Sequence, residues 1–445
     1  MRNDAGAGDG LRATAAARGG AAWQRLSAFQ RTMLLWERLH PYNAVHALRI
    51  LGPSRPQRLA AAIEAVERAA GIGALEIDRS ARACRYVPAA APRVKAGVCD
   101  EVGEQTPTGL LAAGLNASFA GRPQTPFRWT LLEEAGGGAH WVALAYRHVA
   151  ADAHGAQALL AAVLQHGRGG GEAPLLRVDG PRRQRVSLRA RLEALARFAR
   201  TFRRLRCAHK MDEDRQGDDR TECAVRTAAP GLLRELRAAN RRRGAGLNDA
   251  CLAALAATVA ERSPDRHTSR RRRKLALGTV ISRRTRGTSA GEVWLGPALR
   301  DLVVVVDRPD APLAEVLAQI SAQTRAARGL PDPGDFDPRL FLIERAWPLL
   351  GLRHHRRTYR KVFPVCAGVT SFNVHAGWFG PAGVGVDRYV RASPPGPVVP
   401  IALAPTALGD RLELALVYRR ATLTPAAAAD VLAGVHDRLA LLAGG

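Results

Sequence analysis

The sequence predicts a mixed α/β fold, and three observations lead to this prediction. Two short apolar runs, residues 127–132 and 141–146, are separated by a glycine-rich segment. An alanine-rich helical pattern follows at residues 156–164. Farther along, a strand-like segment at residues 221–225 opens a region in which strand and helix patterns alternate to the end of the chain.

The two apolar runs indicate a β-hairpin. Three consecutive glycines between them, residues 136–138, permit the positive backbone angles that a chain reversal needs. The second strand is expected to end at Arg147-His148, just before the predicted helix. His148 would therefore lie on a connection between rigid elements, which is where functional side chains tend to be found.

His148 and Asp152 are four residues apart and form the main candidate for chemistry. An imidazole has an ordinary pKa of about 6.5, so His148 is a candidate general base for a hydroxyl or amine nucleophile. Asp152 is better suited to organising the loop through hydrogen bonds or an arginine pair. By the pattern alone, a histidine and an acid at this spacing more often form an ordinary surface pair.

Composition is that of a globular protein. The chain has 445 residues, of which 47% are hydrophobic, enough for a substantial core. Its length suggests about three domains, or alternatively two large lobes. No apolar run approaches the roughly eighteen residues of a membrane span, and residues 1–22 lack the apolar block of a secretion signal. We expect a disordered leader and a cytoplasmic location.

The cysteines and histidines do not predict a metal site. None of the six cysteines has a close partner at the spacing of a zinc site or a redox dithiol. The histidines are similarly dispersed along the chain. We therefore expect reduced thiols, no metal and no bound cofactor.

The chain carries a formal net charge of +26, almost wholly from arginine. The positive electrostatic potential that this charge creates attracts anions. Three partner classes fit: the phosphates of coenzyme A (CoA), an acidic acyl carrier protein, and an anionic membrane surface. Nucleic acid is not expected, because the most basic run, residues 270–274, has no interleaved aromatic residues.

Much of the positive charge falls in a predicted amphipathic helix at residues 186–206. Its apolar positions recur at spacings of four and three, and arginines occupy much of the remaining surface. Such a helix suits an anionic membrane, which would make the protein peripheral, or a docked carrier protein. The alternative is a linker helix whose apolar face rests on the protein. The apolar positions are Leu188, Leu192, Leu195, Ala199 and Phe202.

Around His148 the chain resembles the CoA-dependent acyltransferase superfamily, which is marked by His-x-x-x-Asp. This superfamily includes chloramphenicol acetyltransferase, nonribosomal peptide condensation domains and the wax ester synthase/diacylglycerol acyltransferases, and the last branch is the most similar. The resemblance spans about residues 24 to 442. The matching segments, in the family's order, are residues 26–30, 42–43, 48–52, 246–256, 275–284, 295–307, 313–328 and 369–377.

The resemblance implies two chloramphenicol-acetyltransferase-like lobes that form a pseudo-dimer around a central tunnel. The expected division is a leader at residues 1–23, an N-terminal lobe at 24–175 with the His-x-x-x-Asp motif, a basic linker helix and hinge at 176–219, and a C-terminal lobe at 220–445. The catalytic histidine would lie midway along the tunnel, with acyl thioester and acceptor entering from opposite faces.

The resemblance also assigns roles to residues. His148 is the expected base, and Asp152 is expected to be held by Arg284 or its neighbour Arg283. Ser371 is similar to the serine that supplies a hydroxyl in chloramphenicol acetyltransferase, and Asn373 to the asparagine of an Asn-Val motif in wax ester synthases. Both are equally well explained as ordinary strand residues. His154 and His375 are further candidates for the acceptor side, each more often structural.

Two residues depart from the family's pattern. Arg147 stands where a first histidine is usual, and Ala153 where a glycine usually follows the aspartate. An alanine there would strain the loop if the site needed a backbone angle open mainly to glycine. Three function classes remain: an acyl-CoA-dependent O-acyltransferase, a stand-alone condensation enzyme that takes acyl groups from a carrier protein to an amine or hydroxyl, and a noncatalytic relative.

Overall fold

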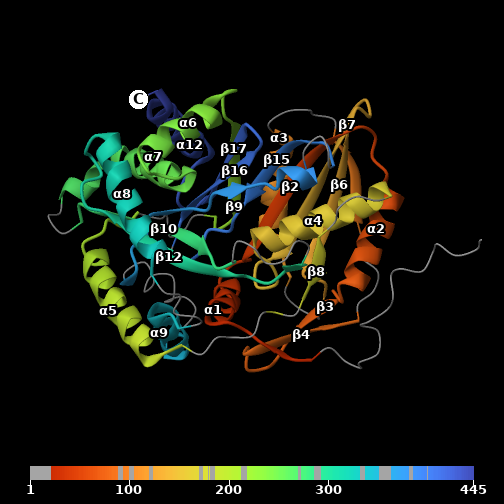
Figure 1. Cartoon of the computed structure of the whole chain (residues 1–445), viewed down its shortest axis with the longest axis horizontal. Coiled ribbons are helices and arrows are strands. Elements are labelled where there is room, and N and C mark those ends of the chain that lie inside the picture. Colours follow the sequence, from red (N-terminus) through yellow and green to blue (C-terminus); the bar gives the residue numbers. More distant parts are fainter. Residues whose placement is uncertain are drawn as a thin grey trace, which may run out of the picture.

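The computed structural model has the mixed α/β fold that the sequence predicts (Figure 1). Residues 1–21 of the predicted leader and residues 212–217 of the predicted hinge lie outside the described part of the chain. The structure describes residues 22–88, 94–99, 105–119, 124–169, 174–178, 180, 186–211, 218–268, 272–284, 292–330, 336–349, 362–379, 384–397 and 399–444.

A five-stranded sheet in the order β15-β2-β7-β6-β5 contains the predicted hairpin. β6 and β7 pair antiparallel across a turn in which Gly136 and Gly137 have positive φ angles, as expected. Four of these strands come from the first half of the chain and β15 from near its end. Their bounds are β2 Asn43–Leu51, β5 Val94–Cys99, β6 Phe127–Glu134, β7 Ala139–Arg147 and β15 Val386–Ala392.

Two helices, α4 (Ala153–Arg168) and α2 (Pro56–Ala69), pack on each other beside this sheet. α4 contains the helix predicted at residues 156–164. Leu159, Leu160 and Val163 of α4 are fully buried in the same apolar core as the sheet. Burying each such side chain contributes about 1.5–3 kcal/mol. The start of α4 is therefore a fixed point next to His148.

A larger sheet lies at the centre of the second half, in the order β12-β10-β13-β16-β17-β9, with β14 beside β16. Its strands are β9 Thr221–Thr227, β10 Leu275–Ser282, β12 Leu299–Val306, β13 Ala367–Val369, β14 Phe372–Asn373, β16 Ile401–Leu408 and β17 Arg411–Arg419. A group of helices packs with this sheet (Figure 1): α6 Leu232–Arg242, α7 Leu247–Glu261, α8 Leu313–Arg328 and α12 Pro425–Gly444.

An apolar cluster joins the two sheets. Val45 of β2 and Ala143 of β7 are buried in it together with Val225 of β9 and Val417 of β17. The helix α3 (Gln105–Leu115) contributes to the same cluster. β15 comes from the predicted C-terminal lobe but completes the sheet of the predicted N-terminal lobe by pairing with β2. The division into lobes and the tunnel between them stay predictions.

The remaining elements connect these two bodies. β8 (Leu175–Arg177) pairs parallel with β11 (Glu292–Trp294), which brings the second half of the chain to the start of α4. A three-stranded sheet has the order β1-β4-β3. The other bounds are β1 Gln24–Arg25, β3 Ala74–Ile77, β4 Ala83–Val87, α1 Ala28–Glu37, α9 Pro338–Ala346, α11 Ala376–Phe379, η1 Pro264–Thr268 and η2 Trp347–Leu349.

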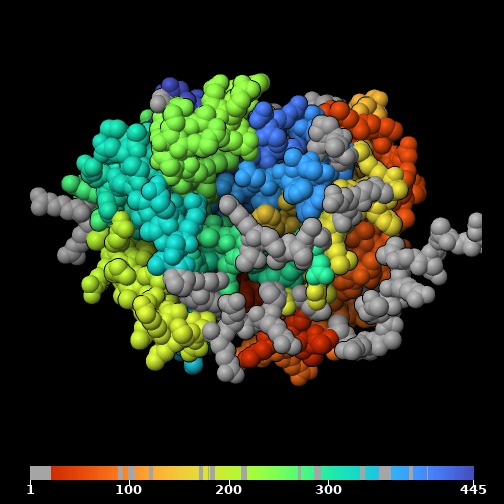
Figure 2. Space-filling view, viewed as in Figure 1, coloured from red at the N-terminus to blue at the C-terminus, as the bar shows by residue number. Residues whose placement is uncertain are grey.

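The predicted basic helix is α5 (Leu188–Leu205), and only part of its apolar face is covered. Near its end, Phe202 lies 6.1 Å from the ring of Phe363. Near its start, Leu188, Leu192 and Leu195 are 72%, 57% and 44% exposed. Figure 2 shows α5 in yellow-green along one edge of the molecule, beside α8 in turquoise. Ala199 of the predicted apolar face is exposed as well, and the buried residues of α5 are Ala194 and Leu205. The linker interpretation therefore accounts for Phe202 and not for most of the predicted face.

Candidate active site

His148 follows the last residue of β7, and its ring orientation is fixed by the loop. Its Nδ1 lies 3.0 Å from the carbonyl oxygen of Ala151. A carbonyl can only accept, so in the neutral ring Nδ1 carries the hydrogen and Nε2 keeps its lone pair. The loop is held from outside as well, because Gln30 of α1 donates its Nε2–H to the carbonyl of Val149 at 2.9 Å.

Two tyrosines surround the half-buried ring of His148. Tyr42 stacks on it at 5.7 Å between ring centroids, and Tyr146 meets it edge-on at 6.0 Å. Burial lowers the pKa of His148, since a charged imidazolium loses its hydration there; the contact with Ala151 and the Asp152 charge oppose this shift. The neutral form, which can accept a proton, is therefore favoured near pH 7.

Asp152 is fully buried and holds the loop through both oxygens. Oδ1 accepts from the Gly155 amide at 2.9 Å and from Arg284 Nη2 at 2.7 Å. Oδ2 accepts from the Ala298 amide at 3.0 Å. Asp152 thus caps α4 and at the same time binds the second half of the chain. These contacts give Asp152 a positioning role.

Arg284 is the arginine that reaches Asp152. It also donates to the carbonyl oxygens of Trp294 and Gly296, at 2.8 and 3.0 Å, so the guanidinium is itself fixed. The neighbouring Arg283 uses its backbone amide to bind the carbonyl of Ala298 at 2.7 Å. The contact expected from the sequence is therefore present through Arg284.

The two departures from the family's pattern fit the structure without strain. Arg147 forms a two-pronged ion pair with Glu37 of α1, with nitrogen–oxygen distances of 2.6–2.9 Å. Ala153 is the first residue of α4 and is not among the described residues with positive φ. The glycine that the loop needs is Gly155, where an added Cβ would lie 2.2 Å from the carbonyl oxygen of Leu295.

Ser371 and Asn373 have separate surroundings. Ser371 Oγ donates to Asn248 Oδ1 at 3.1 Å, and Asn248 in turn donates to Thr279 Oγ1 at 3.0 Å. A hydroxyl has one hydrogen, so Ser371 must rotate away from Asn248 before it can donate to a ligand. Asn373 is exposed, and its Oδ1 accepts from Arg237 Nη2 at 3.3 Å. This contact ties Asn373 to α6.

The two additional histidines contact aromatic rings. His154 meets the edge of Phe372 at 4.9 Å, and burial lowers its pKa. His375 is exposed and stacks on Trp378 at 4.4 Å. These contacts give His375 a structural partner and place His154 beside the aromatic cluster described next.

A buried cluster that the sequence analysis missed lies behind His148. His46 of β2 is fully buried, with Nδ1 hydrogen-bonded to Tyr389 Oη at 2.7 Å and Nε2 3.4 Å from Tyr146 Oη. Burial holds the pKa of His46 well below its usual range, and the positive charge of Arg391 adds to this effect. The cluster joins β2, β7 and β15 directly behind the candidate base.

A cavity of about 160 Å³ lies next to this region. Tyr42, the ring that stacks on His148, forms part of its wall. Gly278 and Gly368, which are paired in register on β10 and β13, leave space that side chains would otherwise fill. The walls are largely apolar; the polar residues among them are Thr279, Asp301, Arg339, Thr370 and Ser393.

The described residues contain no cluster of three or more histidine, cysteine or acidic side chains that could hold a metal ion. Within the same residues, every helix is too short or too polar to cross a lipid bilayer. The prediction of no metal and the predicted location are not tested by these observations.

Comparison with solved structures places the fold. The model superposes on a trichothecene 15-O-acetyltransferase from Fusarium sporotrichioides with a TM-score of 0.71 and 11% identity, covering 97% of both chains. It superposes on the starter condensation domain of rhizomide synthetase with a TM-score of 0.67 and 14% identity, covering 95% of both. It superposes on the condensation domain of the monacolin K polyketide synthase with a TM-score of 0.63 and 14% identity, covering 96% of this chain and 99% of that one.

This is the condensation-domain fold. At these identities the likeness shows the fold alone, and it confirms the predicted mixed α/β fold class. No family model and no curated protein sequence matches the chain. The more specific placement with the wax ester synthases is not confirmed by these structures.

Proposed function

We propose that this protein is an acyltransferase that moves an acyl group from a thioester, in the first place an acyl-CoA, to an acceptor hydroxyl. The observation that carries the proposal is the orientation of His148, whose Nδ1 is committed to Ala151 so that Nε2 keeps its lone pair. The ring stacks on Tyr42, which lines an apolar cavity, although His148 is not itself one of the lining residues. The condensation-domain fold, shared with an O-acetyltransferase, supports the same chemistry.

In this mechanism one imidazole serves both halves of the reaction. Nε2 of His148 takes the proton of the acceptor hydroxyl while the oxygen attacks the thioester carbonyl carbon. The tetrahedral intermediate then collapses, the carbon–sulfur bond breaks, and the departing thiolate receives the proton from Nε2. General base catalysis of this kind contributes about 10²–10⁴-fold to the rate. No covalent acyl-enzyme is required.

The developing oxyanion needs a hydrogen-bond donor, and such a donor contributes about 3 kcal/mol. Ser371 is the proposed donor, after rotation of its hydroxyl away from Asn248. After this rotation Asn248 keeps two partners, because its Oδ1 still accepts from the Ser371 amide at 3.4 Å and its Nδ2 still donates to Thr279 Oγ1 at 3.0 Å. Asn373 stays a prediction that depends on the resemblance alone.

The cavity beside Tyr42 is the proposed site of the acyl chain. An apolar cavity of about 150 Å³ holds a benzene-sized molecule, so this one suits a chain of about six carbons. Val399 and Val365 lie close to the paired glycines Gly278 and Gly368 and limit the chain at that point. Larger side chains at the glycines should therefore shorten the accepted acyl group.

A carrier protein is the alternative source of the acyl group. The uncovered leucines at the start of α5 lie among arginines such as Arg189 and Arg191, and this combination suits an acidic carrier protein. The same features suit an anionic membrane surface. A noncatalytic role gains no support from Arg147 and Ala153, because the structure accommodates both.

The donor can be identified with purified protein. Acyl-CoAs of two to twelve carbons are offered with a panel of alcohols and amines, and thiol release is followed; the same acyl groups are then offered on acyl carrier protein. We expect release from CoA with an optimum near six carbons and with an alcohol. Release from the carrier alone would favour the condensation enzyme, and none from either donor would favour a noncatalytic relative.

A further inference from the structure

Arg391 on β15 is a buried cation without a counter-charge in the described part of the chain. Its side chain is among the most buried of the arginines, at 3% exposed. Nη1 donates to Ser393 Oγ at 2.9 Å and Nη2 to the carbonyl and hydroxyl oxygens of Thr370, all of them neutral. Nε has no hydrogen-bond acceptor among the described residues.

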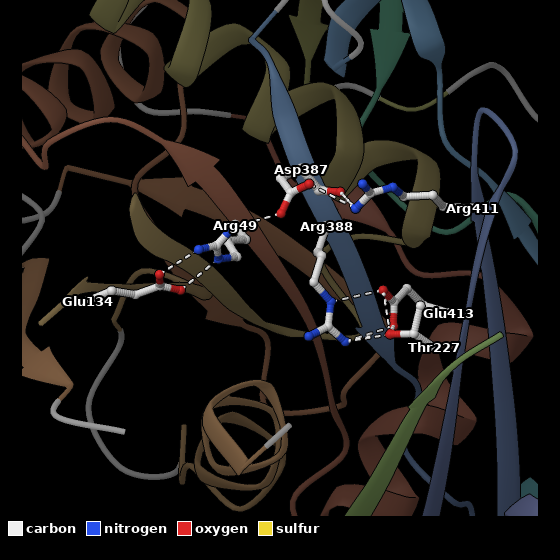
Figure 3. A network of polar contacts seen from close by, with 7 residues as sticks. All are labelled: Arg49, Glu134, Thr227, Asp387, Arg388, Arg411 and Glu413. Carbon is white, nitrogen blue, oxygen red and sulfur yellow. Dashed lines mark hydrogen bonds and ion pairs between the residues drawn. The ribbon is translucent and has the colours of Figure 1, made fainter. Parts of the chain in front are cut away.

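The same strand carries an arginine that is compensated in the ordinary way. Arg388 binds both oxygens of Glu413 at 3.0 Å and Thr227 Oγ1 at 2.9 Å (Figure 3). Nearby, Arg49 reaches both Glu134 and Asp387 in the same network. Among the described residues, Arg388 and Arg49 therefore have carboxylate partners and Arg391 has none.

Burial of an unpaired cation is unfavourable for the folded protein. Burial lowers the pKa of Arg391, which is another expression of the same cost. A bound ligand of opposite charge would offset this cost. The residues around the guanidinium indicate where such a ligand would lie.

Arg391 lies near the candidate active site but is not itself a lining residue of the cavity. Its partners Thr370 and Ser393 both line the cavity beside Tyr42. Its guanidinium carbon lies 5.3 Å above the ring of Phe372, which contacts His154. Burial is the largest effect on the pKa of His148, and the charge of Arg391 is a smaller effect that lowers it in the same direction. The unpaired cation and the candidate base therefore belong to one site.

We propose that Arg391 binds a carboxylate of the substrate. This proposal rests on the proposed function, because it places the carboxylate in the site where His148 acts. A guanidinium binds a planar carboxylate with charge-assisted hydrogen bonds, and the unpaired Nε–H is available for one of them.

One carboxylate fits the charge of the site better than a phosphate dianion does. Arg339, which lines the cavity, is already held by Asp301 and Asp337. Arg391 does not line the cavity but binds two residues that do, Thr370 and Ser393, so it adds one positive charge that has no carboxylate partner among the described residues. The carboxylate can belong to the acceptor, as in a hydroxy acid, or to the acyl group, as in a dicarboxylic acyl thioester.

Binding of matched pairs, measured by calorimetry, distinguishes these two sources. For the acceptor, 3-hydroxybutyrate is compared with its methyl ester; for the donor, glutaryl-CoA is compared with pentanoyl-CoA. We expect the charged member of one pair to bind about tenfold or more tightly than its neutral twin. Equal binding within both pairs would overturn the proposal, and so would inorganic phosphate binding as tightly as the carboxylate.

Variants on the same strand complete the experiment. Arg391→Met should abolish the preference for the charged member, and Arg391→Lys should restore part of it, since it keeps the charge without the guanidinium fork. Arg388→Met is the matched control and should leave the preference unchanged. A preference that survives in Arg391→Met would contradict the proposal.

Stability separates a binding arginine from a structural one. The melting temperature of Arg391→Met should equal or exceed that of the wild type, whereas Arg388→Met should melt lower because Glu413 loses its partner. A fall in Arg391→Met as large as in Arg388→Met would assign Arg391 to the fold and overturn the proposal.

Because the binding assays need no turnover, the two proposals can fail separately. A carboxylate preference that depends on Arg391, without thiol release from any donor, would leave the binding site standing and remove the proposed function. Thiol release without such a preference would support the proposed function and overturn the carboxylate-binding site.

Discussion

Asp152 and Arg391 are both buried charges near His148, but only one of them is compensated. Asp152 receives hydrogen bonds on both oxygens from Gly155, Arg284 and Ala298. Arg391 meets only neutral oxygens in the described part of the chain and keeps one N–H without an acceptor. The difference distinguishes a charge that holds the active-site loop in place from a charge that is available to a ligand.

The largest effect is expected at His148, which lies on the loop that Asp152 holds in place. His148→Ala should lower the rate of thiol release by about 10²–10⁴-fold, because it removes the proposed base. Steady-state assays with the preferred acyl-CoA measure this, and the melting temperature serves as the control for folding. A variant that releases thiol at the wild-type rate would refute the assignment of His148.

Removal of Asp152 tests whether that charge is structural. Asp152→Ala should lower the free energy of unfolding by about 3–5 kcal/mol, because half-buried Arg284 loses its counter-charge and the amides of Gly155 and Ala298 lose their acceptor. Urea denaturation measures the change. Arg284→Met and the double variant complete a cycle in which the losses should be less than additive. Additive losses would mean that the ion pair does not couple the two halves.

Gly155 tests the close contact that brings the second half of the chain to the loop. In Gly155→Ala the new Cβ would lie 2.2 Å from the Leu295 carbonyl oxygen, and backbone atoms cannot easily move aside. We expect a loss of about 1–3 kcal/mol in the free energy of unfolding. Gly138→Ala is the control, since nothing lies within 4 Å of its added Cβ. Equal stabilities would disprove the contact.

The smallest expected effect is on the pH profile, and it links the two charges. Neutral His148 is the active form, so kcat/KM should fall as the pH drops through the pKa of His148, which burial places below its usual 6.5. Arg391→Met removes a nearby positive charge that disfavours the imidazolium. The pKa should then rise, and the acid limb should move to higher pH. A shift to lower pH would contradict this arrangement.

Local features of the site could be predicted from the sequence. Glycines between two apolar runs predict the hairpin, and an alanine-rich pattern after Asp152 predicts the helix; both depend on neighbours in the chain. The pair of Asp152 and Arg284 spans 132 residues and was predicted only through a resemblance. Ala153 does not strain the loop, because it begins the helix α4 and does not adopt a left-handed backbone conformation.

The buried cluster and Arg391 could not be predicted. His46 and Tyr389 are 343 residues apart, and they meet only because β15 pairs with β2. Nothing near Arg391 in the sequence marks it as buried and unpaired, in a chain with 66 lysines and arginines. For α5 the helix itself is correct, but the side that packs on the protein depends on distant elements such as α9. That side includes Ala194 and Leu205, whereas most of the predicted apolar face is exposed.

The late strand β15 also has a consequence for synthesis on the ribosome. Until residues 386–392 emerge, β2 ends its sheet with an unpaired row of backbone donors and acceptors, along most of a strand that spans Asn43–Leu51. Nascent chains with an open strand edge can pair with other chains and aggregate, and chaperones limit this aggregation. The first half of the gene expressed by itself should therefore aggregate, and a peptide that supplies the missing strand should bind to its open edge.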